Sequence, residues 1–453
     1  MHYHSGHSGG VGKIKLSDFL KTGPLKGIDI IGTGDCLHTD WLRTLKSQLI
    51  EVSDGIFALE DYENGTKFIL QTELIFTCAL DSGRKSVHIV FLFPSYEAID
   101  GILQLFDKWD VKNTIGRPFI VCDDPKEVGE RILKIFDIEE YIEVVPAHVM
   151  TPNGVYGSNN PINHLKDFFG EAADRLQIFE TGLSADPLIL SLIRELDDKT
   201  LISNSDSHST RLYRLGREFT SIEVKDLNYE SIIKSLRENN VVFTAEFNPT
   251  EGKYFLTGHR AGKKDHNTSF CSYSPKYTPK NGKCPICGKD LTVGVLERAM
   301  QLSKVQGDMR EYGFLSPGRK DFIHMVPLIE IIANNLGIVT LSAKTVKKEY
   351  LKIVREVGNE CELWFKDKKE IENKLNGVVE KDLIDDINQV KDGNFCFEPV
   401  GFDGSYGELK IGKNIDFFDV KDIFIDEKTK KLIAERKRKE KKRKSKKKLT
   451  EFI

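Results

Sequence analysis

The feature that most limits the fold of this chain is an alternation of short apolar runs with helical patterns over residues 1–246. Such an alternation is typical of α/β domains with parallel strands. We expect strands at 27–32, 67–72, 87–93, 119–122, 142–146, 176–180 and 201–203, with helices between them. Seven strand–helix units predict a barrel or a wound sheet, with functional residues on the loops that follow the strands.

One helix in this region has clear signals at its start. Asp186 can cap the N-terminus, and Pro187 suits the first helical position because its missing N–H is not needed there. Apolar residues then recur at helical spacing at Leu188, Ile189, Leu192, Ile193 and Leu196. The pattern therefore predicts a helix that continues to Leu196.

The rest of the chain divides into segments of different composition. Asn, Pro, Thr and Gly interrupt the alternation near 247–253, which predicts a boundary after a first domain at 1–246. Clustered cysteines mark a small module at 247–295. Helical patterns near 296–305 and 322–336 predict a mostly helical domain at 296–425, and a Lys/Arg-rich tail follows at 426–453.

Composition and charge exclude several classes of protein. The 453 residues are 40% apolar and 30% charged, without a membrane-spanning apolar run or a signal peptide pattern, so we expect a globular cytoplasmic protein. The eight Cys are mostly scattered, which excludes a secreted disulfide framework. Residues 428–448 carry a net charge of +12, so this tail would attract a polyanion; the alternative is a tail that only maintains solubility.

Histidine and acidic residues gather where the predicted strands begin or end. His2 and His4 are two residues apart on an extended segment, so both side chains can face one metal ion, and Asp206 and His208 repeat this spacing. The other clusters contain Asp35 and His38, Glu73, His88, His148 and Glu180. A single buried His is more often a hydrogen-bonded core residue, but one cluster per strand unit predicts a site for two or three Zn, Mn or Fe ions. Such a site can hydrolyse a phosphate ester.

This set of residues resembles the polymerase and histidinol phosphatase (PHP) superfamily. The resemblance covers residues 1–246 and implies a distorted (β/α)7 barrel with up to three metal ions at its mouth. It implies metal ligands at His2, His4, Asp35, His38, Glu73, His88, His148, Glu180, Asp206 and His208, and catalytic roles for Glu180, Asp206 and His208. Met1 directly precedes the first motif, so the first strand is expected either to begin upstream or to be shortened.

A second group of candidate metal ligands lies in the small module. Cys284 and Cys287 belong to a Cys-Pro-Ile-Cys-Gly knuckle whose two thiolates suit a tetrahedral structural zinc. Cys271, 13 residues earlier, is the third candidate ligand, and either His266 or His259 is the fourth. A closed site of this kind would contribute to folding rather than to catalysis. The alternative is that the cysteines of the knuckle form a redox pair or are unrelated to one another.

A barrel, a knuckle and a mostly helical domain in this order resemble the endonuclease Q family of DNA repair enzymes. Matching segments also occur at 291–295, 322–327 and 401–407, so the resemblance spans residues 1–425. It implies a metal-dependent phosphodiesterase that cuts DNA 5′ to uracil, hypoxanthine, xanthine or an abasic site. It also implies structural Zn²⁺, and Zn²⁺, Mg²⁺ or Mn²⁺ at the catalytic site. The chain departs from the family at the knuckle, where a His replaces one Cys of two Cys-x2-Cys pairs.

The last eight residues resemble the clamp-binding motif of DNA repair proteins. Leu449, Phe452 and Ile453 would be its anchors, and Lys446 stands where a Gln is usual. A frayed apolar terminus is the alternative to a sliding-clamp partner. Two other functions stay open for the whole chain: a small-molecule phosphomonoesterase that shares the barrel, and a non-catalytic, zinc-stabilised DNA-binding adaptor.

Overall fold

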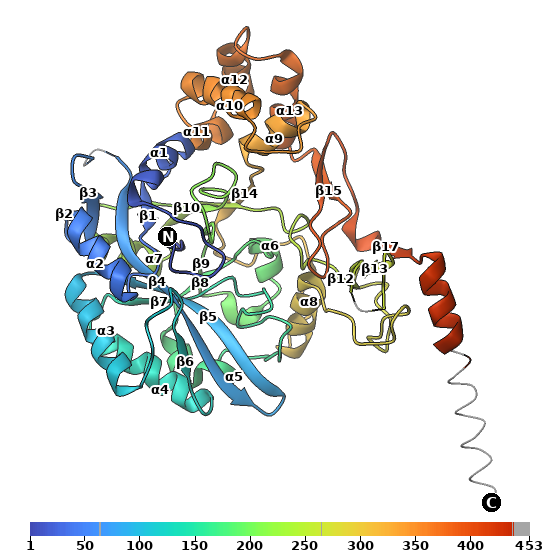
Figure 1. Ribbon diagram of the computed structural model, residues 1–453, viewed down its shortest axis with the longest axis horizontal. Helices are drawn as coiled ribbons and strands as arrows, with labels where there is room; N and C mark the ends of the chain where they lie inside the picture. Colours follow the sequence, from blue (N-terminus) through green and yellow to red (C-terminus); the bar gives the residue numbers. More distant parts are fainter. Residues whose placement is uncertain (63–64, 264, 437, 439–453) are drawn as a thin grey trace, which may run out of the picture.

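A mixed seven-stranded sheet forms the N-terminal part of the molecule (Figure 1). The computed structural model describes residues 1–62, 65–263, 265–436 and 438. The strands follow the order β2-β3-β4-β5-β7, with β1 and β6 also paired to β4. Their bounds are β1 Ile30–Gly32, β2 Leu49–Ser53, β3 Ile56–Leu59, β4 Lys67–Leu80, β5 Gly83–Phe93, β6 Phe119–Val121 and β7 Glu143–Pro146.

A separate parallel pair, β8 (Ile178–Glu180) and β9 (Thr200–Ile202), lies beside β7. The backbone N–H of Val149, just after β7, donates to the carbonyl of Glu180 at 3.2 Å. Beyond β9, Ser207 forms a parallel bridge with Tyr3, and the N–H of His4 donates to the Ser207 carbonyl at 3.2 Å. The strand ends that carry the predicted metal ligands therefore converge.

All seven strands expected from the sequence are present, but their directions are mixed rather than parallel. β1 and β6 run parallel to β4, whereas β5 is antiparallel to β4 and to β7. β4 and β5 are longer than predicted and form a hairpin whose pairing extends to Leu80 and Gly83, so no helix separates them. A two-residue turn can join only antiparallel strands, which explains the mixed sheet.

Helices cover the outside of this sheet, and their starts follow ordinary capping rules. The Ser95 hydroxyl accepts a hydrogen bond from the N–H of Ala98 at 3.2 Å, and the Asp124 carboxylate caps the next helix at Glu127. The helices of this part are α1 Leu16–Lys26, α2 Thr39–Gln48, α3 Tyr96–Lys108, α4 Pro125–Phe136, α5 Lys166–Phe169, α6 Pro187–Leu190 and α7 Tyr229–Arg237.

Helix α6 begins as predicted but ends after one turn. Asp186 accepts a hydrogen bond from the N–H of Ile189 at 2.8 Å, as expected of a cap. The N–H of Glu195 instead donates a hydrogen bond to the side chain of Gln306. The carbonyl of Ser191 accepts a hydrogen bond from the Arg310 guanidinium. Because these long-range partners replace the bond from residue 195 to residue 191, the expected helix to Leu196 does not form.

The C-terminal half contributes strands to sheets that begin earlier in the chain. β14 (Asp321–His324) pairs in parallel with β11 (Val241–Glu246), which also pairs with β10 (Phe219–Ile222). β17 (Lys421–Phe424) pairs with β13 (Phe270–Tyr273), whose other neighbour is β12 (Thr257–His259). β15 (Phe395–Glu398) and β16 (Glu408–Ile411) form a hairpin-like pair.

A helical unit surrounds its own apolar core at the top of Figure 1. Its helices are α9 Leu328–Asn335, α10 Lys344–Val357, α11 Glu360–Phe365, α12 Lys368–Leu375 and α13 Lys381–Lys391. The expected helix at 296–305 is α8 (Val295–Val305), whereas the one expected at 322–336 begins only at Leu328. The preceding residues pair as β14, and Pro327 precedes the helix as its cap. None of the helices in the described ranges is long and apolar enough to cross a membrane.

A buried ion pair joins α1 to this helical unit. The Lys26 ammonium lies 2.7 Å from a carboxylate oxygen of Glu360, and both side chains are at most 1% exposed. Lys26 also donates to the carbonyl of Leu212, and Glu360 accepts from the N–H of Leu328. The pair and its hydrogen bonds thus connect four separate segments, and removing either charge would leave the other buried without its partner.

We expect Lys26→Met to lower the free energy of unfolding by about 3–5 kcal/mol, because Glu360 would keep a buried charge without a counter-charge. Denaturant unfolding followed by circular dichroism measures the change. Lys21→Met is the matched control, since Lys21 is on the same helix with its side chain 73% exposed. Equal stability of the two variants would contradict a structural role for the pair.

Candidate metal centre

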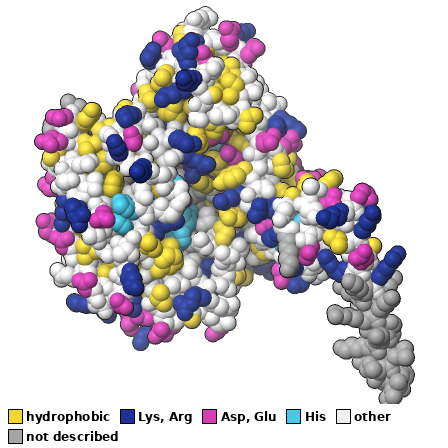
Figure 2. Space-filling model, viewed as in Figure 1, with side chains coloured by type: hydrophobic (Ala, Val, Ile, Leu, Met, Phe, Trp, Pro, Cys, Tyr) yellow, Lys and Arg dark blue, Asp and Glu magenta, His cyan; other side chains and the backbone are white. Residues whose placement is uncertain are grey.

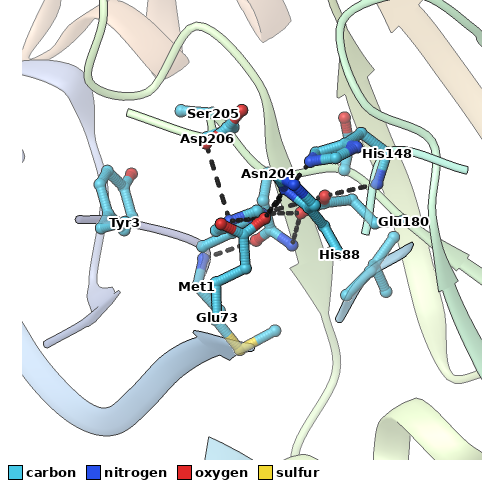
Figure 3. Close-up of polar contacts among 12 residues, drawn as sticks. Met1, Tyr3, Glu73, His88, His148, Glu180, Asn204, Ser205 and Asp206 are labelled. Carbon is cyan, nitrogen blue, oxygen red and sulfur yellow. Dashed lines mark hydrogen bonds and ion pairs between the residues drawn. The ribbon is translucent and has the colours of Figure 1, made fainter. Parts of the chain in front are cut away.

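The Glu73 carboxylate lies at the centre of a buried cluster of histidines (Figure 3). Its Oε1 is 2.8 Å from Nδ1 of His88, 3.4 Å from Nε2 of His148 and 3.6 Å from Nε2 of His2. Its Oε2 is 3.6 Å from Nε2 of His4. Glu73 projects from β4 and His88 from β5. His148 lies in the loop after β7, and His2 and His4 lie in the N-terminal segment. One carboxylate therefore faces four imidazoles.

Asp206 closes the cluster on the side opposite His88. Its Oδ1 lies 3.2 Å from Nε2 of His4, 3.5 Å from Nε2 of His208 and 3.7 Å from Nε2 of His2. The Asp206 side chain is 26% exposed, whereas Glu73 is only 1% exposed. The cluster is thus closed at Glu73 and open to solvent at Asp206.

Three overlapping groups in this cluster bring their ligand atoms within 4.8 Å of one another. These groups are His2, His4 and Glu73; His4, Asp206 and His208; and Glu73, His88 and His148. Seven residues proposed from the sequence as metal ligands are therefore gathered in one place. Glu73 and His4 each belong to two of these groups.

Glu180 lies behind His2 rather than among these groups. Its carboxylate is 3.0 Å from Nδ1 of His2 and accepts hydrogen bonds from the N–H of His148 at 2.9 Å and from Asn204 at 3.0 Å. A carboxylate on the far nitrogen of a ligating His fixes the ring and its tautomer. Asn204 was not singled out from the sequence, although it stands two residues before Asp206.

Asp35 and His38 also lie outside the three groups. Asp35 faces Nδ1 of His4 at 3.4 Å and accepts from the hydroxyls of Ser5 and Ser8 at 2.5 and 2.9 Å. The ring of His38 stacks on that of His7 with centroids 4.0 Å apart. In this structure Asp35 therefore orients His4, and the direct metal-ligand roles of Asp35 and His38 stay predictions.

Carboxylates and imidazoles shift one another's pKa values in the cluster. Burial raises the pKa of Glu73, but the charges of His88 and His2 and the hydrogen bond from His148 outweigh it and hold that pKa well below its ordinary value. Burial lowers the pKa of His4, but hydrogen bonds to Asp206 and Asp35 raise it to about 10 overall. Metal ions would take the place of these protons.

Three residues around the cluster adopt a left-handed backbone conformation. The φ angles are 45° at Asp35, 32° at His148 and 41° at Asp206. For residues other than Gly this conformation costs about 1 kcal/mol or more each, and such strain is concentrated at functional sites. The surrounding hydrogen bonds hold these residues in place, and each side chain points toward the histidines.

The residues present fit metal ions. Imidazole nitrogen and carboxylate oxygen together suit Zn, Mn or Fe. Among the described residues, Nε2 of His2 is buried without a hydrogen-bond partner, and it faces both Glu73 and Asp206. A buried ring nitrogen without a partner is costly unless a ligand satisfies it. A metal ion between these groups would do so.

A large cleft opens directly onto the exposed side of the cluster. Its volume is about 840 Å³, and its wall includes His88, His148, Asp206 and His208. The same wall carries the basic residues Lys13, Arg117, Arg211, Arg214, Arg217 and Lys253 and the aromatic residues Tyr213, Phe247, Tyr254 and Tyr406. Figure 2 shows His side chains at the middle of this face with Lys and Arg around them. The cleft is therefore suited to an anionic ligand with flat rings.

The sequence reasoning missed these basic and aromatic residues. Part of the signal was present, because three Arg and one Tyr occur at 211–217, directly after the Asp206–His208 motif. Tyr406 lies in the segment 401–407 noted above, although nothing there indicated a place on the cleft wall, and Arg117 had no comparable signal, since it is far from any motif residue in the sequence.

The small module brings a second set of donors together. His259, His266, Cys284 and Cys287 are all buried, and their ligand atoms lie within 4.8 Å of one another. Sγ of Cys284 is 3.4 Å from Nε2 of His266, and Sγ of Cys287 is 3.4 Å from Nδ1 of His259. Two thiolates and two imidazoles suit tetrahedral zinc. Both alternative histidines are thus present, while Cys271 lies outside this group of four and its role as a ligand stays a prediction.

Two proteins of known sequence are similar to parts of the chain. No family model matches the chain. Over 237 residues it is 33% identical to an uncharacterised protein of Methanocaldococcus jannaschii, an alignment that covers 51% of this chain but only 28% of that relative. Over 319 residues it is 28% identical to an uncharacterised protein of Bacillus subtilis, covering 67% of this chain and 72% of the relative.

Two solved structures are similar over most of the chain. One is the lesion-specific endonuclease Q of Pyrococcus furiosus, with a TM-score of 0.74 and 28% identity over 91% of this chain and 94% of that one. The other is endonuclease Q in complex with a 27-mer duplex that has an abasic lesion at the active site. Its TM-score is 0.72, with 26% identity over 93% of this chain and 97% of that one.

We expect Glu73→Gln to reduce the metal content of the cluster by at least one ion per chain, because a neutral amide replaces the carboxylate that faces four imidazoles. Elemental analysis after equilibration with Zn²⁺ or Mn²⁺ measures the loss. Glu97→Gln, an exposed position in the first turn of α3, is the control. Unchanged metal content in Glu73→Gln would show that the cluster is not a metal site.

Proposed function

The chain resembles endonuclease Q over nine-tenths of its length, and from this we propose that it is a lesion-specific DNA repair endonuclease, a metal-dependent phosphodiesterase. The observation that carries the proposal is the cleft lined by basic and aromatic residues that opens onto the Asp206 side of the cluster. Phosphates pair with Lys and Arg, and bases stack on aromatic rings. We propose hydrolysis of the phosphodiester 5′ to uracil, hypoxanthine, xanthine or an abasic site.

The proposed fold is the distorted PHP barrel, formed by β1, β4, β5, β7, β8 and β9 with the N-terminal segment. The convergence of Glu73 from the middle of β4, His148 from the loop after β7 and Asp206 from the loop after β9 supports it. Metal ions held by the histidines and carboxylates of the cluster would activate water and neutralise charge on the phosphate. In the small module, zinc would serve the fold alone.

Arg117 is placed to orient the phosphate. Its guanidinium lies 3.4 Å from Oε2 of Glu73, and its side chain is 25% exposed on the cleft wall. Guanidinium groups bind phosphate oxygens in a planar, bidentate manner. Arg117 can therefore hold a non-bridging oxygen next to the cluster, while Asp206 at the solvent-exposed edge aligns His4 and His208.

The aromatic wall of the cleft gives a place for a base outside the duplex. Tyr254 and Tyr406 both lie beside the Lys253 ammonium, at 5.4 and 5.8 Å from the ring centroids, and Phe247 lines the same cavity. An enzyme that reads a base in a duplex must extrude it, and weakened pairing at a deaminated base lowers that cost. We propose that the damaged nucleotide enters the cleft against these rings.

The two other functions are less well supported. A small-molecule phosphomonoesterase would not need a cleft of about 840 Å³ with six basic residues on its wall. A non-catalytic adaptor would not need to keep seven metal-ligating side chains together in one cluster. Both alternatives predict that the protein leaves damaged DNA uncut.

We expect the protein to nick end-labelled duplexes 5′ to uracil, hypoxanthine and abasic sites, and a chelator to prevent this. Asp206→Asn should reduce nicking by about 10³-fold or more while the protein still binds DNA, because the change removes a ligand charge and not a core contact. Asp107→Asn, at an exposed position of α3, should nick normally. Release of a free base before any strand break would instead indicate a glycosylase, and nicking by Asp206→Asn at the normal rate would exclude this metal centre.

The proposed clamp contact depends on Leu449, Phe452 and Ile453, which lie outside the described residues. We expect deletion of residues 446–453 to abolish binding to a purified sliding clamp without changing the nicking rate, because such motifs insert an aliphatic and an aromatic anchor into one apolar pocket. Calorimetry measures clamp binding. Lys446→Ala should keep it, and a full-length chain that does not bind the clamp would refute the motif.

A further inference from the structure

The small module contains one more metal-binding side chain than a tetrahedral site needs. Four donors, His259, His266, Cys284 and Cys287, lie within 4.8 Å of one another. The fifth, Cys271, is also buried, and its Sγ lies 3.7 Å from Sγ of Cys284. A structural zinc takes four ligands. One of the five donors is therefore in excess, and Cys271 is the one that lies outside the group of four.

The position of Cys271 is fixed by its strand. It lies on β13 opposite His259 of β12, and on the other side opposite Ile423 of β17. Cys284 is fixed by the knuckle, in which its N–H donates to the carbonyl of Lys289 and its sulfur accepts the N–H of Ile286 at 3.4 Å. Strand β13 and the knuckle thus fix the two sulfurs independently at neighbouring positions.

A zinc-bound cysteine is deprotonated, so Cys284 would be a thiolate on the metal. The Sγ of Cys271 lies 3.7 Å from it. The knuckle is at the surface, where Lys283, Pro285 and Lys289 are exposed. Cys284 itself is only 2% exposed, so a small oxidant alone could reach it, and the thiolate is the reactive form of cysteine.

We propose that Cys271 is not a zinc ligand but a resolving thiol, which forms a disulfide with Cys284 when a peroxide oxidises the knuckle, and that this releases the zinc. The Cys284 thiolate attacks one peroxide oxygen, the O–O bond breaks, and a sulfenic acid and hydroxide form. The Cys271 thiol then attacks the sulfenic sulfur, the S–O bond breaks, and water leaves. Two thiols are oxidised and one peroxide is reduced to two waters, with solvent protonating the hydroxide.

Loss of the metal would also affect the C-terminal segment that packs on the module. Thr429 donates to the carbonyl of His266 at 3.2 Å, and Arg436 donates to that of Ile286 at 3.0 Å. Ile425 and Ile433 pack against the cysteine cluster. Because both carbonyls belong to the metal-binding loops, their displacement would free residues 425–436, which include the start of the Lys/Arg-rich tail.

The inference depends on the proposal that the four donors hold zinc, but not on the nuclease activity. Its test uses the full-length, zinc-loaded protein treated with hydrogen peroxide. A chromogenic chelator follows zinc release, and peptide mass spectrometry maps disulfides. We expect one zinc released for each disulfide between Cys271 and Cys284, reversal by a thiol reductant, and faster tryptic cleavage within 425–436. The centre around Glu73 has no cysteine ligand, so peroxide should leave its metal in place.

Cys271→Ser is the decisive variant. It should contain as much zinc as the wild type when purified, and release it at least about tenfold more slowly in peroxide. Cys396→Ser, a buried cysteine on β15, should behave like the wild type. A Cys271→Ser protein purified without zinc would identify Cys271 as a ligand and overturn the proposal. So would an unchanged release rate, or a disulfide between Cys284 and Cys287.

A second measurement needs no variant. Co²⁺ in place of zinc gives thiolate-to-metal charge-transfer bands whose intensity reports the number of thiolate ligands. We expect the intensity of two thiolates in the wild-type protein, and the intensity of three would overturn the proposal even if Cys271→Ser failed to fold. Zinc content and nicking are measured separately, so a protein that switches but does not cut DNA would leave this inference intact and refute only the proposed function.

Discussion

A single buried carboxylate, that of Glu73, is the constraint on which the N-terminal part of the molecule depends. Burying a charge without compensation costs several kcal/mol, so the fold must bring counter-charges to it. Four imidazoles do so, from β5, from the loop after β7 and from the N-terminal segment. The convergence of strand ends, the left-handed backbone at His148 and Asp206 and the orienting contacts of Asp35 and Glu180 all serve this arrangement.

Much of this arrangement could be predicted from local patterns. All seven predicted strands are present in the N-terminal part, because apolar runs flanked by polar residues are a local signal, but β2, β3, β10 and β11 were not predicted. Seven of the ten proposed metal ligands lie in the three overlapping groups. His148 and Asp206 follow β7 and β9, as expected of loops after strands, whereas Glu73 and His88 lie within the long strands β4 and β5. The hairpin of β4 and β5 was missed, since a pattern of apolar residues does not reveal the direction in which a strand runs.

What could not be predicted depends on contacts between distant segments. Asn204 reaches Glu180 across 24 residues, and Arg117 reaches Glu73 across 44. The premature end of α6 has the same origin, because Gln306 binds the N–H of Glu195 from 111 residues away. For Asp35 and Glu180 the sequence identified the right residues, whereas only the geometry shows that they lie behind His4 and His2. The distinction between a metal ligand and the residue that orients it has no signal in sequence spacing.

The pairing of β14 with β11 and of β17 with β13 has a consequence for biosynthesis. During translation, one edge of β11 stays unpaired until residue 324 has left the ribosome. One edge of β13 likewise stays unpaired until residue 424 has left it. Until then both edges can pair with another nascent chain. Premature termination before residue 421 would leave β13 permanently open on one side, so such fragments would be prone to aggregate. Completion of the chain is thus itself a step in folding, and the last strand closes the sheet that holds His259 and Cys271.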